Sequence, residues 1–192
     1  MRNMTNKPIR VGFDLDGVLL YNPARIARYP VTIFKRFFFK KKQLKFYFPV
    51  RQWEKTFWRI LHWSSLFIAP GFDEIKKLVK DGKIEAYLIT GRYSFLENDL
   101  RWWLKRMKID HIFTGIHHNS KDEQPHIFKK RMINKLDLDI FVEDNFDIVS
   151  HLSKEGDRKI YWIYNIIDRY IDHPYKFPTL SKAVDHLKES LS

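Results

Sequence analysis

An apolar segment that ends abruptly in acidic residues is the feature that most constrains this chain. Residues 9–20 read IRVGFDLDGVLL, so an apolar run with β-branched residues breaks into Asp14-Leu15-Asp16-Gly17. Such a run is typical of a buried parallel strand. Ligands of open α/β sheets bind at the carboxyl ends of the strands, where side chains two residues apart lie on the same side. The segment therefore predicts two carboxylates at a ligand site, although Asp-x-Asp-Gly also occurs in ordinary surface turns.

Helix and strand patterns alternate after residue 70. We predict strands over 84–89, 111–114, 139–142 and 159–163, and helices over 72–80, 94–107, 125–136, 146–155 and 181–191. The helix that starts at Ser94 is expected to begin with a capping box closed by Glu97. Alternating strands and helices imply a parallel sheet, whose strands all end at the same edge. That edge would collect Asp14, Asp16, Thr90, Glu143 and Asp144.

Composition narrows the kinds of chemistry that the site can use. The chain has 192 residues, which suits one domain with a modest insertion, and its apolar runs are too short or too interrupted for a transmembrane segment. The start, MRNMTNKPIR, lacks the apolar run of a signal peptide, so we expect a cytoplasmic protein. With no cysteine, disulfides, thiolate metal sites and cysteine nucleophiles are excluded. Carboxylates become the leading candidates for catalysis.

The positive charge of the chain is concentrated in one segment. The formal net charge is +12, and residues 20–70 contribute +10 of it, because they contain one acid, Glu54, and eleven basic residues. The basic residues are Arg25, Arg28, Lys35, Arg36, Lys40, Lys41, Lys42, Lys45, Arg51, Lys55 and Arg59. The segment is also rich in aromatic residues, which the flanking regions do not match. We therefore predict an insert over 21–70, within a core formed by 1–20 and 71–192.

The insert is predicted to fold as helical hairpins. Pro30 can open a helix with an apolar stripe formed by Ile33, Phe34, Phe37 and Phe38, and a second stripe is formed by Trp53, Phe57, Ile60 and Leu61. Two interpretations remain open. The stripes could pack against each other and leave the basic residues as a solvated face, or the insert could be a lid that presents cations to an anionic substrate.

Taken together, these motifs resemble those of the haloacid dehalogenase superfamily. Its phosphatases carry an Asp-x-Asp-Gly motif, a strand-end Thr or Ser, a Lys and an acidic pair, which correspond here to FDLDGV, LITGR, Lys129 and VEDN. The resemblance covers most of the chain outside the insert and implies a Rossmann-like core with a small helical cap after the first strand. It is closest to small nucleotidase-like members.

The resemblance also implies a role for each matching residue. Asp14 would be the nucleophile that forms an aspartyl-phosphate, and Asp16 the general acid and base. Mg²⁺ would be held by the Asp14 side chain, the Asp16 carbonyl group and Asp144. The Thr90 hydroxyl and the Gly91 N–H would bind phosphate, whose charge Lys129 would help to neutralise.

The chain departs from the family pattern at the acidic pair. The pair is Glu143-Asp144 rather than two aspartates, so we expect Glu143 to act on the metal indirectly, through water or another ligand. Lys129 and Lys130 lie about 100° apart on a helix, so only one can face the site. Spacing favours Lys129, with Lys130 and Lys121 as alternatives.

Three other residues could belong to the site but have simpler explanations. His117 and His118 lack the spacing of a helical metal site, and we predict a solvated loop. Arg92 is expected to form a structural ion pair rather than to bind substrate.

Three functions fit this sequence. The first is a Mg²⁺-dependent phosphomonoesterase that acts on a small phosphorylated metabolite, such as a nucleotide. The second is removal of end phosphates from a polynucleotide, suggested by the basic and aromatic insert. The third is a non-catalytic module whose insert binds RNA or an anionic membrane surface. The sequence does not indicate an oligomeric state.

Overall fold

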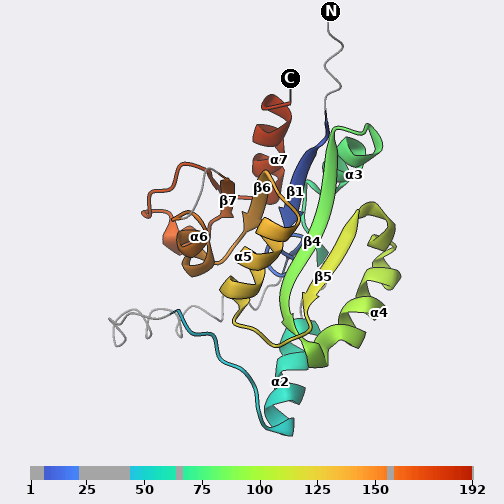
Figure 1. Ribbon diagram of the computed structural model, residues 1–192, viewed down its shortest axis with the longest axis vertical. Coiled ribbons are helices and arrows are strands. Elements are labelled where there is room, and N and C mark those ends of the chain that lie inside the picture. Colours follow the sequence, from blue (N-terminus) through green and yellow to red (C-terminus); the bar gives the residue numbers. More distant parts are fainter. Residues whose placement is uncertain (1–6, 22–43, 64–66, 155–157, 192) are drawn as a thin grey trace, which may run out of the picture.

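The fold is built on a parallel sheet. The computed structural model describes residues 7–21, 44–63, 67–154 and 158–191 (Figure 1). Six strands pair in the order β5-β4-β1-β6-β7-β8, and every pair is parallel. They are β1 (Ile9–Phe13), β4 (Ile84–Tyr93), β5 (Gly115–Asn119), β6 (Ile140–Glu143), β7 (Lys159–Ile163) and β8 (Lys176–Phe177). The predicted Rossmann-like α/β architecture is confirmed.

Helices cover both faces of the sheet. Helices α5 (Pro125–Lys135) and α6 (Phe146–Leu152) pack on one face, and α3 (Phe72–Lys80), α4 (Glu97–Met107) and α7 (Leu180–Glu189) pack on the other (Figure 1). Successive side chains of strand β4 point to opposite faces of the sheet and pack against the helices on each face. Tyr87 and Ile89 pack with α5 and α6, whereas Leu88 packs in the cluster that contains α3, α4 and α7. Strands buried on both faces explain the continuous apolar runs in the sequence.

Strand β1 lies between the two strands whose ends carry the other motifs. It pairs with β4 on one side and β6 on the other, so Phe13 lies opposite both Leu88 and Val142. The Asp14 N–H continues the ladder by donating to the Val142 carbonyl at 2.9 Å. The chain then turns tightly, with a positive φ of 88° at Gly17. This pairing fixes the position along the sheet at which the Asp14 side chain projects.

The insert connects to the core through a short two-stranded sheet. Strand β2 (Leu20–Tyr21) pairs antiparallel with β3 (Phe67–Ile68), where the insert leaves and returns. Helix α2 (Gln52–Trp63) lies below the sheet edge in Figure 1. In the part of the chain that the structure describes, its predicted stripe is largely exposed, since Trp53, Phe57 and Ile60 are 55–64% exposed. The helix that we predicted from Pro30 lies outside the described residues.

Polar contacts hold α2 on the start of α4. The Arg59 guanidinium Nε lies 3.1 Å from one Asp99 carboxylate oxygen, and the Trp63 indole N–H donates to the other at 3.3 Å. Before α2, the chain passes the start of α5, where the Phe46 N–H donates to the Gln124 side-chain carbonyl at 2.6 Å. The described part of the insert is thus anchored at two places near the strand ends.

Two local predictions were wrong. The strand expected over 111–114 is a 3₁₀ turn, η3 (Asp110–Ile112), followed by β5 at 115–119. The apolar Ile112 and Phe113 are buried in the core from this turn, whereas β5 is a polar edge strand that lacks an apolar pattern. Ser94 does not cap a helix. Its N–H and hydroxyl both donate to the Asp122 carboxylate, so the chain makes a 3₁₀ turn, η2 (Ser94–Leu96), before α4 begins.

The remaining described elements complete the core near β8. A short 3₁₀ turn, η4 (Ile166–Asp168), precedes β8. No helix in the described part of the chain combines the length and the apolarity that crossing a bilayer requires.

Gly71 joins the insert to α3 at a position that excludes other residues. Its φ is +100°, and an added Cβ would lie 2.7 Å from the Ser181 Cα. We expect Gly71→Ala to lower the free energy of unfolding by roughly 2–4 kcal/mol, because it adds a backbone clash to conformational strain. Gly82 is the matched control, since its φ is +66° but nothing lies within 4 Å of an added Cβ. Gly82→Ala should cost about 1 kcal/mol in urea denaturation, and equal losses would contradict the clash.

Candidate active site

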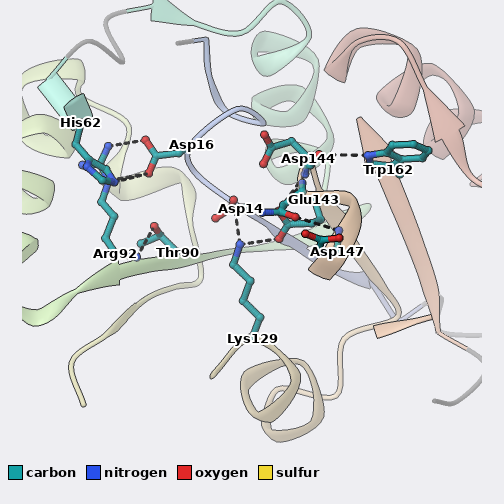
Figure 2. A network of polar contacts seen from close by, with 11 residues as sticks. Asp14, Asp16, His62, Thr90, Arg92, Lys129, Glu143, Asp144, Asp147 and Trp162 are labelled. Atoms are coloured by element: carbon teal, nitrogen blue, oxygen red, sulfur yellow. Dashed lines mark hydrogen bonds and ion pairs between the residues drawn. The ribbon is translucent and has the colours of Figure 1, made fainter. Parts of the chain in front are cut away.

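The β1 loop sends its two carboxylates in different directions. Leu15 is fully buried in the core, and Asp14 and Asp16 on either side of it lie at the sheet edge. Figure 2 shows Asp14 facing the ends of α5 and β6, and Asp16 facing the end of β4. The two predicted acids therefore belong to two separate polar groups, which we describe in turn.

A buried lysine links the first group. The Lys129 ammonium nitrogen lies 3.0 Å from an Asp14 carboxylate oxygen and 2.6 Å from a Glu143 carboxylate oxygen. Its side chain is only 3% exposed. Lys130 turns away and lines a surface depression with Ile133 and Asn134, and Lys121 is exposed. Of the three candidate lysines, the structure brings only Lys129 to Asp14.

Both carboxylate oxygens of Glu143 accept hydrogen bonds. One carboxylate oxygen contacts Lys129, and the other accepts the backbone N–H groups of Asp144 and Asn145 at 3.1 and 2.9 Å. Such contacts stabilise the ionised form of a buried carboxyl group. Helix α6 starts directly after this turn. The Asn145 side chain caps it by accepting the backbone N–H of Asp147. The backbone that follows β6 thus holds the Glu143 side chain in place.

Burial shifts the protonation equilibria of this group. Burial raises the pKa of Asp14 to about 6, against the opposing charge of Lys129, and the charges of Asp144 and Asp16 add to the rise. Burial also raises the pKa of Glu143. Burial would lower the pKa of Lys129, but the charges of Asp14 and Glu143 outweigh it and raise the pKa. Lys129 therefore remains an ammonium ion at neutral pH.

A third carboxylate gives this group an excess of negative charge. Carboxylate oxygens of Asp14, Glu143 and Asp144 lie within 4.8 Å of one another. Once ionised, the three acids face one ammonium, and buried charge without a partner is costly. Mg²⁺ prefers hard oxygen ligands of this kind, and it would offset the excess charge. The residues present therefore fit a divalent cation at this edge.

The end of β4 carries the predicted phosphate-binding residues. Thr90 is 1% exposed, and its hydroxyl oxygen accepts the Arg92 backbone N–H at 3.3 Å. Gly91 lies against α5, where an added Cβ would be 3.1 Å from Pro125 and 3.8 Å from the Lys129 Cε. A side chain at Gly91 would therefore intrude between β4 and the buried lysine.

The second polar group surrounds Asp16. Arg92 donates two hydrogen bonds to its carboxylate, from Nε at 2.8 Å and from Nη2 at 2.7 Å. His62 on α2 approaches the same carboxylate, with its Nε2 at 4.0 Å, and its Nδ1 lies 2.8 Å from the Trp58 carbonyl oxygen. Arg92 forms the ion pair that we expected. Its partner, Asp16, was not expected. The approach of His62 was not expected either, because it depends on how α2 docks on the core.

The histidine pair lies away from both groups. His117 and His118 are half-buried on the edge strand β5, so the predicted loop was wrong. The His118 Nε2 lies 3.2 Å from a Glu97 carboxylate oxygen. Burial lowers the pKa of His117, with a smaller contribution from the charge of Lys135. A strand of polar residues at a sheet edge explains why its pattern resembles that of a loop.

Comparison with known proteins identifies the fold. No protein-family model matches the chain, and no curated protein matches its sequence. Solved structures do match. CbbY from Rhodobacter sphaeroides in complex with phosphate has 12% identity and a TM-score of 0.58, over 92% of this chain and 98% of its own. A hydrolase of the haloacid dehalogenase superfamily from Ehrlichia chaffeensis has 15% identity and a TM-score of 0.54, over 97% of this chain and 99% of its own.

The chain has the haloacid dehalogenase fold. A component of the Pnkp1/Rnl/Hen1 RNA repair complex shares it, with 14% identity and a TM-score of 0.53 over 85% of this chain and 45% of that one. The resemblance based on FDLDGV, LITGR and VEDN is thereby confirmed for the fold. Within the haloacid dehalogenase fold, the closeness to nucleotidase-like members stays a prediction.

The raised pKa of Asp14 predicts how stability depends on pH without metal. Because the folded state binds this proton more tightly than the unfolded state, stability should fall as the pH rises from about 4 to about 6. Asp14→Asn removes the buried charge. We expect it to raise the free energy of unfolding by roughly 1–3 kcal/mol at pH 7.5 in EDTA, and to change it little at pH 4. A loss of stability at pH 7.5 would contradict the cost that we assign to this carboxylate.

The acidic cluster predicts a metal-dependent gain in stability. Mg²⁺ at about a hundred times its dissociation constant should stabilise the protein by about 2.7 kcal/mol. Measured as the shift from each variant's own metal-free Tm, the effect should fall far more for Asp144→Ala than for Glu143→Gln. The reason is that we assign the direct contact to Asp144, whereas Lys129 and two N–H groups already engage Glu143. A larger loss in Glu143→Gln would reverse the two roles.

Proposed function

We propose that the protein is a Mg²⁺-dependent phosphomonoesterase that acts through an aspartyl-phosphate on Asp14. The observation that carries the proposal is the cluster in which Lys129 joins Asp14 to Glu143, with Asp144 beside them. Buried carboxylates destabilise a fold unless they are compensated, so a core that served only as scaffold would gain nothing from two of them with a third beside them. A phosphoryl-transfer site needs this arrangement, because it must bring a nucleophilic carboxylate to an anionic phosphate.

Each residue of the candidate site then has a chemical role. An Asp14 carboxylate oxygen forms a bond to phosphorus as the bond to the leaving oxygen breaks, and Asp16 donates a proton to that oxygen. Water next attacks phosphorus and gives a proton to Asp16. This attack breaks the bond between phosphorus and Asp14, so that phosphate is released and the Asp14 carboxylate is restored. The Thr90 hydroxyl and the Gly91 N–H hold phosphate oxygens, and Lys129 offsets the charge of Asp14 and the phosphoryl group.

The cation would be held by the Asp14 side chain, the Asp16 carbonyl group and Asp144. When bound, Mg²⁺ supplies positive charge that reduces the repulsion between carboxylate and phosphate. Glu143 would act indirectly, by holding Lys129 and the Asp144 backbone in place. In the described residues, Asp14, Glu143 and Asp144 form the only group of three or more acids and histidines that could hold a metal.

The proposed substrate is a small phosphorylated metabolite, with a nucleotide as one candidate. The phosphate present in the CbbY structure supports phosphate chemistry in this fold, and the nucleotidase-like motifs favour a nucleotide. A cytoplasmic location agrees with such a substrate and remains an expectation.

Removal of end phosphates from a polynucleotide is the second candidate. Helix α2 exposes Trp53, Phe57 and Trp63 near the exposed basic residues Arg51 and Arg59, the mixture that binds single strands by stacking and charge. The related fold in an RNA repair complex supports the same idea. Turnover of a phosphorylated oligonucleotide should then fall steeply with salt, whereas turnover of a mononucleotide should not.

Asp14→Asn should abolish phosphate release while the protein stays folded, because an amide cannot attack phosphorus. The test is a panel of sugar phosphates, nucleotides, phosphorylated oligonucleotides and p-nitrophenyl phosphate, with Mg²⁺ or EDTA. Circular dichroism checks the fold, and Asp147→Asn, at an exposed acid on α6, is the matched control. Turnover by folded Asp14→Asn near the wild-type rate would eliminate the covalent mechanism.

A further inference from the structure

The proposed reaction needs Asp16 as its acid, but Asp16 is held in an ion pair with Arg92. Both Asp16 carboxylate oxygens accept hydrogen bonds from the Arg92 guanidinium, which is the geometry of a bidentate ion pair (Figure 2). The Arg92 side chain is 4% exposed and the Asp16 side chain 14% exposed. A carboxylate held in this way is ionised and has both oxygens engaged. It cannot deliver a proton to a leaving group until the pair opens.

Opening the pair creates a second requirement. Arginine stays charged in proteins, and Arg92 is too deeply buried for water to replace the carboxylate fully. Removing one partner of a buried ion pair is strongly destabilising, because the other charge is left without compensation. Another anion must therefore take the place of Asp16 beside the guanidinium during turnover.

The position of Arg92 identifies where that anion would come from. Arg92 follows Thr90 by two residues on β4, and its backbone N–H donates to the Thr90 hydroxyl oxygen. Because this contact joins the two residues, an anion at Arg92 would lie near a phosphate bound at Thr90. The Asp14 and Lys129 side of the site already serves the phosphoryl group that is transferred. The second anion would belong to the leaving-group part of the substrate.

We propose that Arg92 binds a second phosphate group of the substrate and thereby releases Asp16, which takes up a proton from solvent and then acts as the acid. The substrate class is then a phosphomonoester whose leaving group carries another phosphate, either a bisphosphorylated metabolite or the phosphorylated end of an oligonucleotide. This inference rests on the proposed phosphatase activity. Arg92 is a specificity residue in this scheme, and a substrate without the second phosphate leaves the acid in its ion pair.

Helix α2 contributes to the same position. The Nε2 of His62 lies 4.0 Å from the Asp16 carboxylate, and α2 is fixed to the core by the contacts of Arg59 and Trp63 with Asp99. The insert therefore brings a polar side chain next to the ion pair. A leaving group bound at Arg92 would therefore lie near α2.

The first test compares matched substrates in the full-length protein with Mg²⁺. The pairs are a hexose bisphosphate with its monophosphate, and a phosphorylated dinucleotide with the mononucleotide. Wild type should favour the member with the second phosphate group in at least one pair, with a kcat/KM about tenfold to a hundredfold higher, the worth of a hydrogen bond to a charged group. The pair that shows this preference tells the metabolite from the oligonucleotide. Arg92→Gln should remove the preference, Arg92→Lys should restore part of it, and Arg101→Gln on the exposed surface of α4 is the control.

The second test uses binding and does not require turnover. Asp16→Asn removes the competitor for Arg92, so it should bind the preferred substrate with two phosphate groups more tightly than wild type in calorimetry, while its affinity for inorganic phosphate should change less. A residue that only supported the fold would not produce this gain. Unchanged affinity in Asp16→Asn, or an equal loss of kcat/KM for both members of the preferred pair in Arg92→Gln, would overturn the inference. Absence of phosphate release from every substrate, p-nitrophenyl phosphate included, would instead reject the proposed function.

Discussion

The site depends on one buried ammonium group. Lys129 on α5 contacts carboxylates that leave β1 and β6, so it joins three elements at the point where two parallel strands end. Each acid alone would be costly to bury, and the lysine alone would be costly as well. Their mutual contact makes the arrangement tolerable and fixes the height of α5 over the sheet. The same contact places a cation beside the carboxylate that we propose as nucleophile.

The β1 loop creates two environments from two neighbouring aspartates. Asp14 lies with Lys129, Glu143 and Asp144, whereas Asp16 is held by Arg92 near α2. Different surroundings for two carboxylates are a general way to divide nucleophile and acid between them. Asp14 is placed by the core alone, and Asp16 is placed where core and insert meet. Chemistry and substrate choice would therefore be controlled from opposite sides of one loop.

Much of this site could be predicted from the sequence, because the ends of parallel strands must meet at one edge. That rule brought Asp14, Thr90 and Asp144 together without any knowledge of side-chain positions. It could not predict that Arg92 pairs with Asp16, because that depends on the direction in which the β1 loop sends its second carboxylate. It could not predict the approach of His62 either, since α2 is held by tertiary contacts of Arg59 and Trp63. Local patterns also failed where tertiary contacts override them: Ser94 binds Asp122 instead of capping a helix, and the edge strand β5 carries no apolar signal.

The central claim is that Asp14 becomes phosphorylated, and direct trapping tests it most clearly. The protein would be mixed with p-nitrophenyl phosphate and Mg²⁺, quenched in acid within the first turnovers, and reduced with borohydride, which converts an aspartyl-phosphate to homoserine. We predict that peptide mass spectrometry finds homoserine at position 14 and at no other aspartate. Steady phosphate release with no modification at Asp14, or with the modification at another acid, would contradict the account.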